Sequence, residues 1–309
     1  MSVHCQVELT TTSFCCITCI NAHNYLVLSK MNSCGSGGSK ESNIRAENEA
    51  EAEEKHFRSI INAFKYYRTH SVRRLLLAEK YFDELPDHHK AMLPSFRDNL
   101  KRLRICIYHN YEIIKLIIAD VDHLFENTVL ERDQDAVIHP SPETDMEKVR
   151  TVLKQIARDW TVQGEAERNA CYTPVLKEIV KSFPKDKYKT ENIQVLIPGA
   201  GLGRLAFEVA RLGYSCQGNE FSFFMLFTSN FILNRCKETN LYVLYPWIHQ
   251  FCNNLASSDQ TSPVQFPDVN PTQLNPDVNF SMAAGDFLEV YTDPGIFCIK
   301  HYCFKCSFS

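Results

Sequence analysis

Three glycines in five positions form the stretch of this sequence best suited to hold a ligand. Gly199, Gly201 and Gly203 directly follow the apolar run IQVLI (193–197). A strand that enters a glycine-rich loop and then a helix is typical of adenosine-cofactor sites. Glycine lets the backbone approach the ligand closely, and the helix N-terminus offers unpaired N–H groups. The spacing therefore indicates a cofactor site, and a tight turn without a ligand is the open alternative.

The detail of this loop distinguishes between cofactors. The dinucleotide pattern G-x-G-x-x-G has glycine at its sixth position, where this chain has Arg204. A bulky, charged side chain at that position argues against a nicotinamide cofactor, so a nicotinamide-dependent reductase is a disfavoured alternative. A P-loop is excluded more firmly, because no G-K-[ST] follows the glycines.

Two acidic residues stand where further strands are expected to end. Glu220 closes the segment YSCQGNE, and Asp286 with Phe287 closes the segment NFSMAAGDF. A carboxylate only accepts hydrogen bonds and therefore suits the two neighbouring hydroxyls of a ribose, which makes Glu220 the candidate ribose ligand. Asp286 is suited to accept from an adenine amino group, and Phe287 to lie against the adenine ring.

The elements that carry these residues follow from the spacing of apolar side chains. Up to residue 190 the spacing is helical, and from residue 192 short strands alternate with helices. This order predicts an α/β fold in which a helical N-terminal region precedes a parallel sheet. Helices are expected at 43–85, 94–126, 145–160, 164–183, 204–212 and 223–237. Strands are expected at 193–197, 214–220 and 279–287, with a long loop at 257–277.

The composition of the chain argues against several classes of protein. A net charge of −4 over 309 residues gives no general attraction for nucleic acid or an anionic membrane surface. No apolar run reaches the roughly 18 residues of a membrane span. Thirteen cysteines, an odd number without framework spacing, indicate reduced thiols in the cytoplasm or nucleus. The CxxC pairs Cys16/Cys19 and Cys303/Cys306 lie at opposite ends, so we expect no metal site.

Longer stretches carry a resemblance to a known family. The G-x-G-x-G loop followed by an acid is similar to the first motif of class I S-adenosylmethionine-dependent methyltransferases. The segments QVLIPGAGLGRLAFEVARLGYSCQGNEFSFFMLFTSNFILNRC and YPWIHQFCNN resemble the carnosine N-methyltransferase family, and EEKHFRSIINAFKYYR and KQIARDW resemble its N-terminal helices. The resemblance covers about residues 53–290. It implies S-adenosyl-L-methionine as cofactor and the imidazole of carnosine, or of related histidine dipeptides, as methyl acceptor, with anserine as the product from carnosine.

The resemblance also implies a cofactor site. Gln155 and Arg158 of KQIARDW lie one helical turn apart on one face, and Arg158 is expected to pair with the cofactor carboxylate. An exposed helix face is the alternative for both. The aromatic segment YPWIHQF (245–251) is a candidate acceptor pocket, with packing beneath the long loop as its alternative. The full set of expected cofactor ligands is Gln155, Arg158, Gly199, Gly201, Glu220, Asp286 and Phe287.

The family's acceptor-binding residues lie beyond the third strand, and the resemblance fades after about Val290. We therefore assign no catalytic residue and expect an incomplete Rossmann-like class I methyltransferase sheet, in which the tail segment GIFCIKHYCF supplies at best one substitute strand. On this interpretation the chain is a truncated form that folds poorly or is inactive. The alternatives are a non-catalytic cofactor-binding or regulatory isoform and a protein-histidine methyltransferase.

These patterns divide the chain into four expected segments. Residues 1–42 are expected to form a disordered or atypical leader, 43–190 the helical region, 191–290 the partial methyltransferase domain, and 291–309 a divergent tail. The long N-terminal helices suit a homodimer interface. Reduced thiols and the family together place the expected location in the cytoplasm and nucleus.

Overall fold

The computed structural model describes the backbone at residues 7–13, 26–27, 40–119, 121, 138–291 and 300–306. It describes side chains at 51–119, 121 and 138–291.

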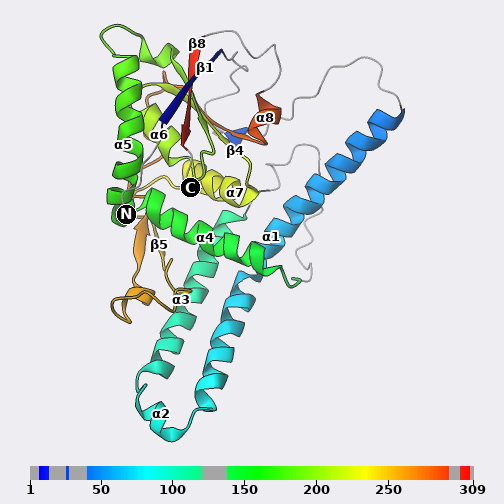
Figure 1. Ribbon diagram of the computed structural model, residues 1–309, viewed down its shortest axis with the longest axis vertical. Coiled ribbons are helices and arrows are strands. Elements are labelled where there is room, and N and C mark those ends of the chain that lie inside the picture. The colour runs from blue at the N-terminus through cyan, green and yellow to red at the C-terminus, as the bar shows by residue number, and fades with distance from the viewer. Residues whose placement is uncertain are drawn as a thin grey trace.

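Two long helices form an arm that projects from the rest of the molecule (Figure 1). α1 (Lys40–Asp83) and α3 (Phe96–Ile117) run side by side in opposite directions, and the short α2 (Asp87–Ala91) joins them at the tip. α1 ends just before Pro86, as the sequence predicts, because proline has no N–H to continue a helix. The expected second helix, 94–126, ends at Ile117, and 122–126 lies outside the described residues.

Two further helices connect the arm to the sheet. α4 (Glu143–Trp160) and α5 (Glu165–Ser182) lie within two residues of the predicted helices, and a single 3₁₀ turn (Val162–Gly164) separates them. A Cβ on Gly164 would lie 2.0 Å from the carbonyl oxygen of Arg158. Real Cβ atoms do not approach that closely, so glycine is required where the chain turns back against the end of α4.

A small parallel sheet carries the glycine loop. The middle strand β4 (Ser215–Glu220) pairs in parallel with β3 (Gln194–Pro198) on one side and β7 (Phe280–Ala284) on the other. α6 (Arg204–Arg211) follows β3, and α7 (Phe223–Arg235) follows β4. This arrangement confirms the predicted α/β fold with a small parallel sheet.

Segments from both ends of the sequence extend the sheet, whose strand order is β1-β8-β3-β4-β7-β2. β8 (Lys300–Cys306) lies parallel to β3, where the tail was expected to offer a substitute strand. β1 (Val7–Ser13) pairs with β8 in antiparallel fashion, and β2 (Leu26–Val27) lies parallel to β7. The expected leader, 1–42, thus contributes two strands, because the edges of a parallel sheet offer unpaired N–H and C=O groups.

Part of the expected loop 257–277 forms a second sheet. β5 (Tyr242–Leu244) and β6 (Val264–Phe266) pair in antiparallel fashion. The prediction of a continuous loop was wrong here, because strands of three residues are too short to show a period-2 pattern. The described elements are completed by the short helix α8 (Phe287–Val290) and by two 3₁₀ turns, at Thr190–Asn192 and Asp259–Thr261.

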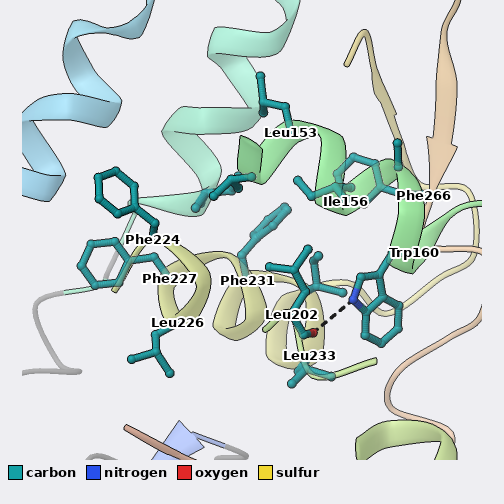
Figure 2. Packing of buried hydrophobic residues seen from close by; sticks show 14 of the residues in the cluster. Leu153, Ile156, Trp160, Leu202, Phe224, Leu226, Phe227, Phe231, Leu233 and Phe266 are labelled. Carbon is teal, nitrogen blue, oxygen red and sulfur yellow. Dashed lines mark hydrogen bonds between the residues drawn. The ribbon is translucent and has the colours of Figure 1, made fainter. Parts of the chain in front are cut away.

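One hydrophobic core joins the helical region to the sheet. α7 is buried on nearly all sides, because it contacts α1, α3 and α4 while following directly from β4. Figure 2 shows Phe224, Phe227 and Phe231 of α7 in one apolar cluster with Leu153, Ile156 and Trp160 of α4. Trp160 is fully buried, and its indole N–H donates to the carbonyl oxygen of Leu202 over 3.1 Å. A fully buried large apolar side chain of this kind contributes about 1.5–3 kcal/mol to the free energy of unfolding.

Within the described residues, no helix combines the length and apolar character that a membrane crossing requires.

Candidate functional site

The glycine loop lies between the end of β3 and the first turn of α6. Its three glycines have φ values of +63°, +56° and +76°, a left-handed backbone that disfavours side chains. Gly203 is the N-cap residue of α6. A Cβ at Gly199 would meet nothing within 4 Å, so the backbone there borders open space. The loop therefore has the form predicted for a ligand cradle at a helix N-terminus.

Glu220, the candidate ribose ligand, reaches the glycine loop from the end of β4. Its Oε2 accepts a hydrogen bond from Gly201 N over 2.8 Å. Its Oε1 accepts from Phe221 N (2.9 Å) and Ser222 N (2.8 Å), at the start of α7. One carboxylate thus ties the loop to the next helix. Since a carboxylate has about four lone-pair sites, three backbone donors leave room for about one more partner.

The end of β7 lies beside the end of β4. Gly285 N donates to the carbonyl oxygen of Glu220 over 3.0 Å, and the side-chain amide of Asn219 donates to the carbonyl oxygens of Ala283 (3.4 Å) and Gly285 (3.1 Å). Asn219 is 2% exposed. Our sequence reasoning did not single it out, although it directly precedes Glu220 at the strand end.

Asp286 and Phe287 follow this turn, but they do not end the strand as predicted. β7 stops at Ala284, and Asp286 caps the short helix α8 (Phe287–Val290), with its Oδ1 accepting from Leu288 N over 2.7 Å. The Phe287 ring is half-buried against Tyr291, with ring centroids 5.2 Å apart. The strand was predicted too long because Gly285, with a φ of +128°, turns the backbone out of the sheet.

Gln155 lies over the glycine loop. Its Oε1 would be 3.7 Å from a Cβ on Gly201, which places the side chain in contact distance of the loop. The structure thus brings together the C-terminal half of α4 and the ends of β3 and β4, which lie far apart in the sequence.

Arg158 lies on the same helix but faces a carboxylate of the chain itself. Its Nε and Nη2 donate to Oδ1 and Oδ2 of Asp159 over 2.7 and 3.1 Å. Tyr172 also donates to Asp159 Oδ1, over 3.1 Å. Burial disfavours the guanidinium charge, but Asp159 outweighs it and raises the pKa of Arg158. The edge of Arg158 best suited to a ligand carboxylate is therefore occupied by Asp159, a residue that we did not single out.

Arg204 has a structural role that the sequence did not indicate. It is buried, with its guanidinium 4.8 Å from the Trp160 ring centre, and it pairs through Nη1 and Nη2 with both carboxylate oxygens of Asp268. Its Nη1 also donates to the carbonyl oxygen of Asp159 over 2.8 Å. Arg204 therefore fixes the start of α6, and with it the glycine loop, to the end of α4.

Arg168 completes this network. Its Nη2 pairs with Asp268 over 2.6 Å, and its Nη1 donates to the carbonyl oxygens of Arg158 and Thr161. Cations at the C-terminal end of a helix are favoured by the helix dipole. Two arginines at the end of α4 thus share one carboxylate, and no local sequence signal connects the three residues.

The segment YPWIHQF packs against the arm. His249 Nε2 lies 3.1 Å from the hydroxyl oxygen of Tyr67, which also accepts from the Asn110 amide over 3.3 Å. Asn110 also donates to the carbonyl oxygen of Tyr245 and accepts from its backbone N–H. Burial, with Arg150 and other nearby cations, lowers the pKa of His249 to about 3. These contacts favour the packing alternative over an acceptor pocket.

Metal-binding side chains do not cluster in the part of the chain whose side chains are described: no three of His, Cys, Asp and Glu come together there. The Cys16/Cys19 pair lies outside the described residues, and the backbone alone is described for Cys303 and Cys306.

The family model for carnosine N-methyltransferase matches residues 134–304, which is more than half of the chain. The chain belongs to the carnosine N-methyltransferase family. The matched range includes the glycine loop, Glu220, Gln155 and Arg158. It also continues past Val290, where the resemblance was expected to fade, into β8.

Curated relatives agree with this assignment. The chain is 52% identical over 248 residues to the mouse protein named carnosine N-methyltransferase, covering 80% of this chain and 62% of that protein. It is 42% identical over 274 residues to the Drosophila melanogaster protein of that name, covering 82% of this chain and 60% of that protein. It is 41% identical over 247 residues to the Schizosaccharomyces pombe protein of that name, covering 78% of this chain and 65% of that protein. The chain thus spans somewhat less than two thirds of these relatives.

Proposed function

We propose that this chain binds S-adenosyl-L-methionine at the ends of β3, β4 and β7 and is a methyltransferase that acts on the imidazole of carnosine. The observation that carries the proposal is the pairing of the left-handed glycine loop, open above Gly199, with a carboxylate hydrogen-bonded to Gly201. This arrangement suits an adenosine with a charged tail, because backbone N–H groups and a hydroxyl acceptor lie side by side.

Each expected ligand has a role in this proposal. Gly199 and Gly201 let the backbone pass beneath the amino-acid part of the cofactor, and Glu220 accepts from a ribose hydroxyl with its remaining lone pair. Asp286 accepts from the adenine amino group with the oxygen that does not cap α8, and Phe287 covers the ring. Gln155 and Arg158 approach from α4. Asp159 holds Arg158 in a two-point pair through Nε and Nη2, and Arg158 contributes its positive charge to the cofactor carboxylate.

The proposed reaction places modest demands on this chain. The bound cofactor supplies an electrophilic methyl group. The acceptor imidazole, with an unperturbed pKa near 6.5, is mostly neutral at pH 7, so no strong base is needed to make it a nucleophile. The contribution of the protein is then to orient the two reactants and exclude water. Anserine is the product when carnosine is the acceptor.

The finer fold assignment belongs to the same proposal. β8, β3, β4 and β7 are parallel neighbours in that order, which is compatible with a Rossmann-like class I methyltransferase sheet. We propose 43–190 as the helical region and 191–290 as a partial Rossmann-like methyltransferase domain. A homodimer through α1 and α3, and a location in the cytoplasm and nucleus, complete the proposal. The alternatives are a protein-histidine methyltransferase and a regulatory protein that binds the cofactor without catalysis.

Calorimetry followed by an activity assay tests the proposal. The chain is expected to bind S-adenosylhomocysteine but not NADH, and to transfer a labelled methyl group to carnosine. Transfer to a histidine-containing protein but not to carnosine would favour the protein-methylating alternative. Binding without transfer to either acceptor would favour the regulatory one. Binding of NADH in place of S-adenosylhomocysteine would refute the cofactor assignment.

A further inference from the structure

We propose that Asn219 is a positioning residue that sets the adenine side of the cofactor site and couples it to the glycine loop. This inference rests on the proposed function, because it assigns to the turn after β7 the adenine contact made there by Asp286. Asn219 itself lies beneath the turn, so its role is to hold the groups that would touch the cofactor.

The side chain of Asn219 fastens the turn that precedes Asp286. Its amide nitrogen donates to the carbonyl oxygens on both sides of Ala284, those of Ala283 and Gly285. Gly285 has a φ of +128°, which a side chain would disfavour, and its N–H is bonded to the carbonyl oxygen of Glu220. Three hydrogen bonds from the end of β4 thus define where the chain leaves β7 and where Asp286 begins α8.

The backbone of the same residue holds the glycine loop. The carbonyl oxygen of Asn219 accepts from Ala200 N over 2.9 Å, between Gly199 and Gly201. The next residue, Glu220, binds Gly201 through its carboxylate. Asn219 is therefore the point at which the loop beneath the methionine end and the turn beneath the adenine end meet.

The chemistry of the position favours an amide. Two carbonyl acceptors require two N–H donors, and the neutral –NH₂ group of asparagine supplies both in a buried site. An aspartate of the same shape would turn a carboxylate oxygen toward two carbonyl oxygens and would repel them. An alanine would leave both carbonyls without these donors, so that the turn loses two of its three hydrogen bonds to the end of β4 and keeps that of Gly285 N.

The neighbouring strand position offers a matched control. Gln217 lies two residues earlier on the same face of β4 and also bonds across to the β7 segment. Its Nε2 donates to Ser281 Oγ over 3.2 Å, and its Oε1 accepts from the Tyr291 hydroxyl over 2.8 Å. Gln217→Ala therefore removes a comparable side-chain amide bridge between the same strands and leaves the hydrogen bonds of Asn219 to the turn and the loop in place. Because Tyr291 packs against Phe287, a change at that ring would affect the binding of both ligands below alike and leave their ratio unchanged.

The first experiment compares two ligands. S-inosylhomocysteine differs from S-adenosylhomocysteine in carrying an oxygen in place of the adenine amino group. The unsubstituted chain is expected to prefer S-adenosylhomocysteine by about tenfold to a hundredfold, the value of one hydrogen bond to a charged group. In Asn219→Ala and Asn219→Asp this ratio should fall toward one, while Gln217→Ala should keep it. Asn219→Ser, which retains one donor, is the milder variant if the others do not fold.

The second experiment needs no cofactor. Hydrogen exchange in the ligand-free protein should become faster at the amides of Gly285 and Leu288 in Asn219→Ala, with the amides in the middle of α5 unchanged. The Gln217→Ala protein should keep the exchange of the unsubstituted chain at Gly285.

The outcomes separate the two proposals. If Asn219→Ala keeps the ligand ratio of the unsubstituted chain, the positioning role is wrong while the cofactor assignment stands. Equal binding of both ligands by the unsubstituted chain would overturn the contact of Asp286 with adenine and, with it, this role. If no S-adenosylhomocysteine binds at all, the proposed function fails. Hydrogen exchange then decides alone whether Asn219 holds the turn, and unchanged exchange at Gly285 would disprove that.

Discussion

Asp268, in the loop after β6, forms a buried two-point ion pair with Arg204, the residue that directly follows the glycine loop. The two side chains are 7% and 5% exposed, and Arg204 Nη2 lies 3.2 Å from Asp268 Oδ2. The pair connects residues that are 64 positions apart and lies where the helix after the loop meets the end of α4. A residue in a distant loop thus determines where the proposed cofactor cradle sits.

Replacing Asp268 by asparagine is expected to destabilise the fold by about 3–5 kcal/mol, because it leaves Arg204 and Arg168 as buried cations without their shared carboxylate. Urea denaturation followed by circular dichroism measures the effect. The exposed Asp277 in the same loop is the matched control, and Asp277→Asn should change the unfolding free energy by less than about 0.5 kcal/mol. Equal stability of the two variants would show that the buried pair contributes nothing.

Gly164→Ala tests the close approach of α5 to the end of α4. The added Cβ would meet the carbonyl oxygens of Arg158 and Ala157, which belong to backbone and cannot move aside. We expect a loss of about 1–3 kcal/mol in the unfolding free energy, as for other overpacked sites. Gln163→Ala, at the exposed neighbouring position, is the control. A melting temperature that differs little between the two variants would contradict the geometry.

His249 predicts a specific pH dependence of stability. Its folded pKa of about 3 lies below the unfolded value near 6.5, so the folded state favours the neutral ring. The resulting stability is complete above pH 6.5 and is lost as the pH falls toward 3, by at most about 1.4 kcal/mol per pH unit. In His249→Asn the unfolding free energy should depend less steeply on pH between about 3 and 6.5, by up to about 1.4 kcal/mol per pH unit. The exposed His88→Asn should leave the curve unchanged.

Glu220→Gln tests the carboxylate at the glycine loop. The substitution removes the negative charge and turns an NH₂ group toward backbone N–H donors. The loop then loses a charge-assisted hydrogen bond that is worth about 1.5–3 kcal/mol. S-adenosylhomocysteine is expected to bind about tenfold to a hundredfold more weakly in calorimetry. The exposed Glu238→Gln should bind like the unsubstituted chain. Unchanged affinity in Glu220→Gln would remove Glu220 from the proposed site.

The sequence predicted the elements that repeat regularly and missed those set by distant partners. The helices around Trp160 and the strand that ends at Glu220 follow from local periodicity, so their bounds were close. The same reasoning interpreted Arg204 only as an argument against nicotinamide, because its partner Asp268 is far away in the chain. Arg158 was expected to face a ligand, yet the neighbouring Asp159 holds it. Long-range pairing and the competition of nearby charges leave no periodic trace in one sequence.

The burial of α7 has a consequence for producing fragments of this protein. Phe57 of α1 meets Phe223 and Phe227 edge-on, with ring centroids 5.5 and 5.0 Å apart, and Phe64 lies 5.5 Å from Phe224. A fragment that begins at residue 191 would expose these α7 rings to water and would be prone to aggregate. The helical arm and the sheet should therefore melt in a single cooperative transition, and expression boundaries placed between them should give insoluble protein.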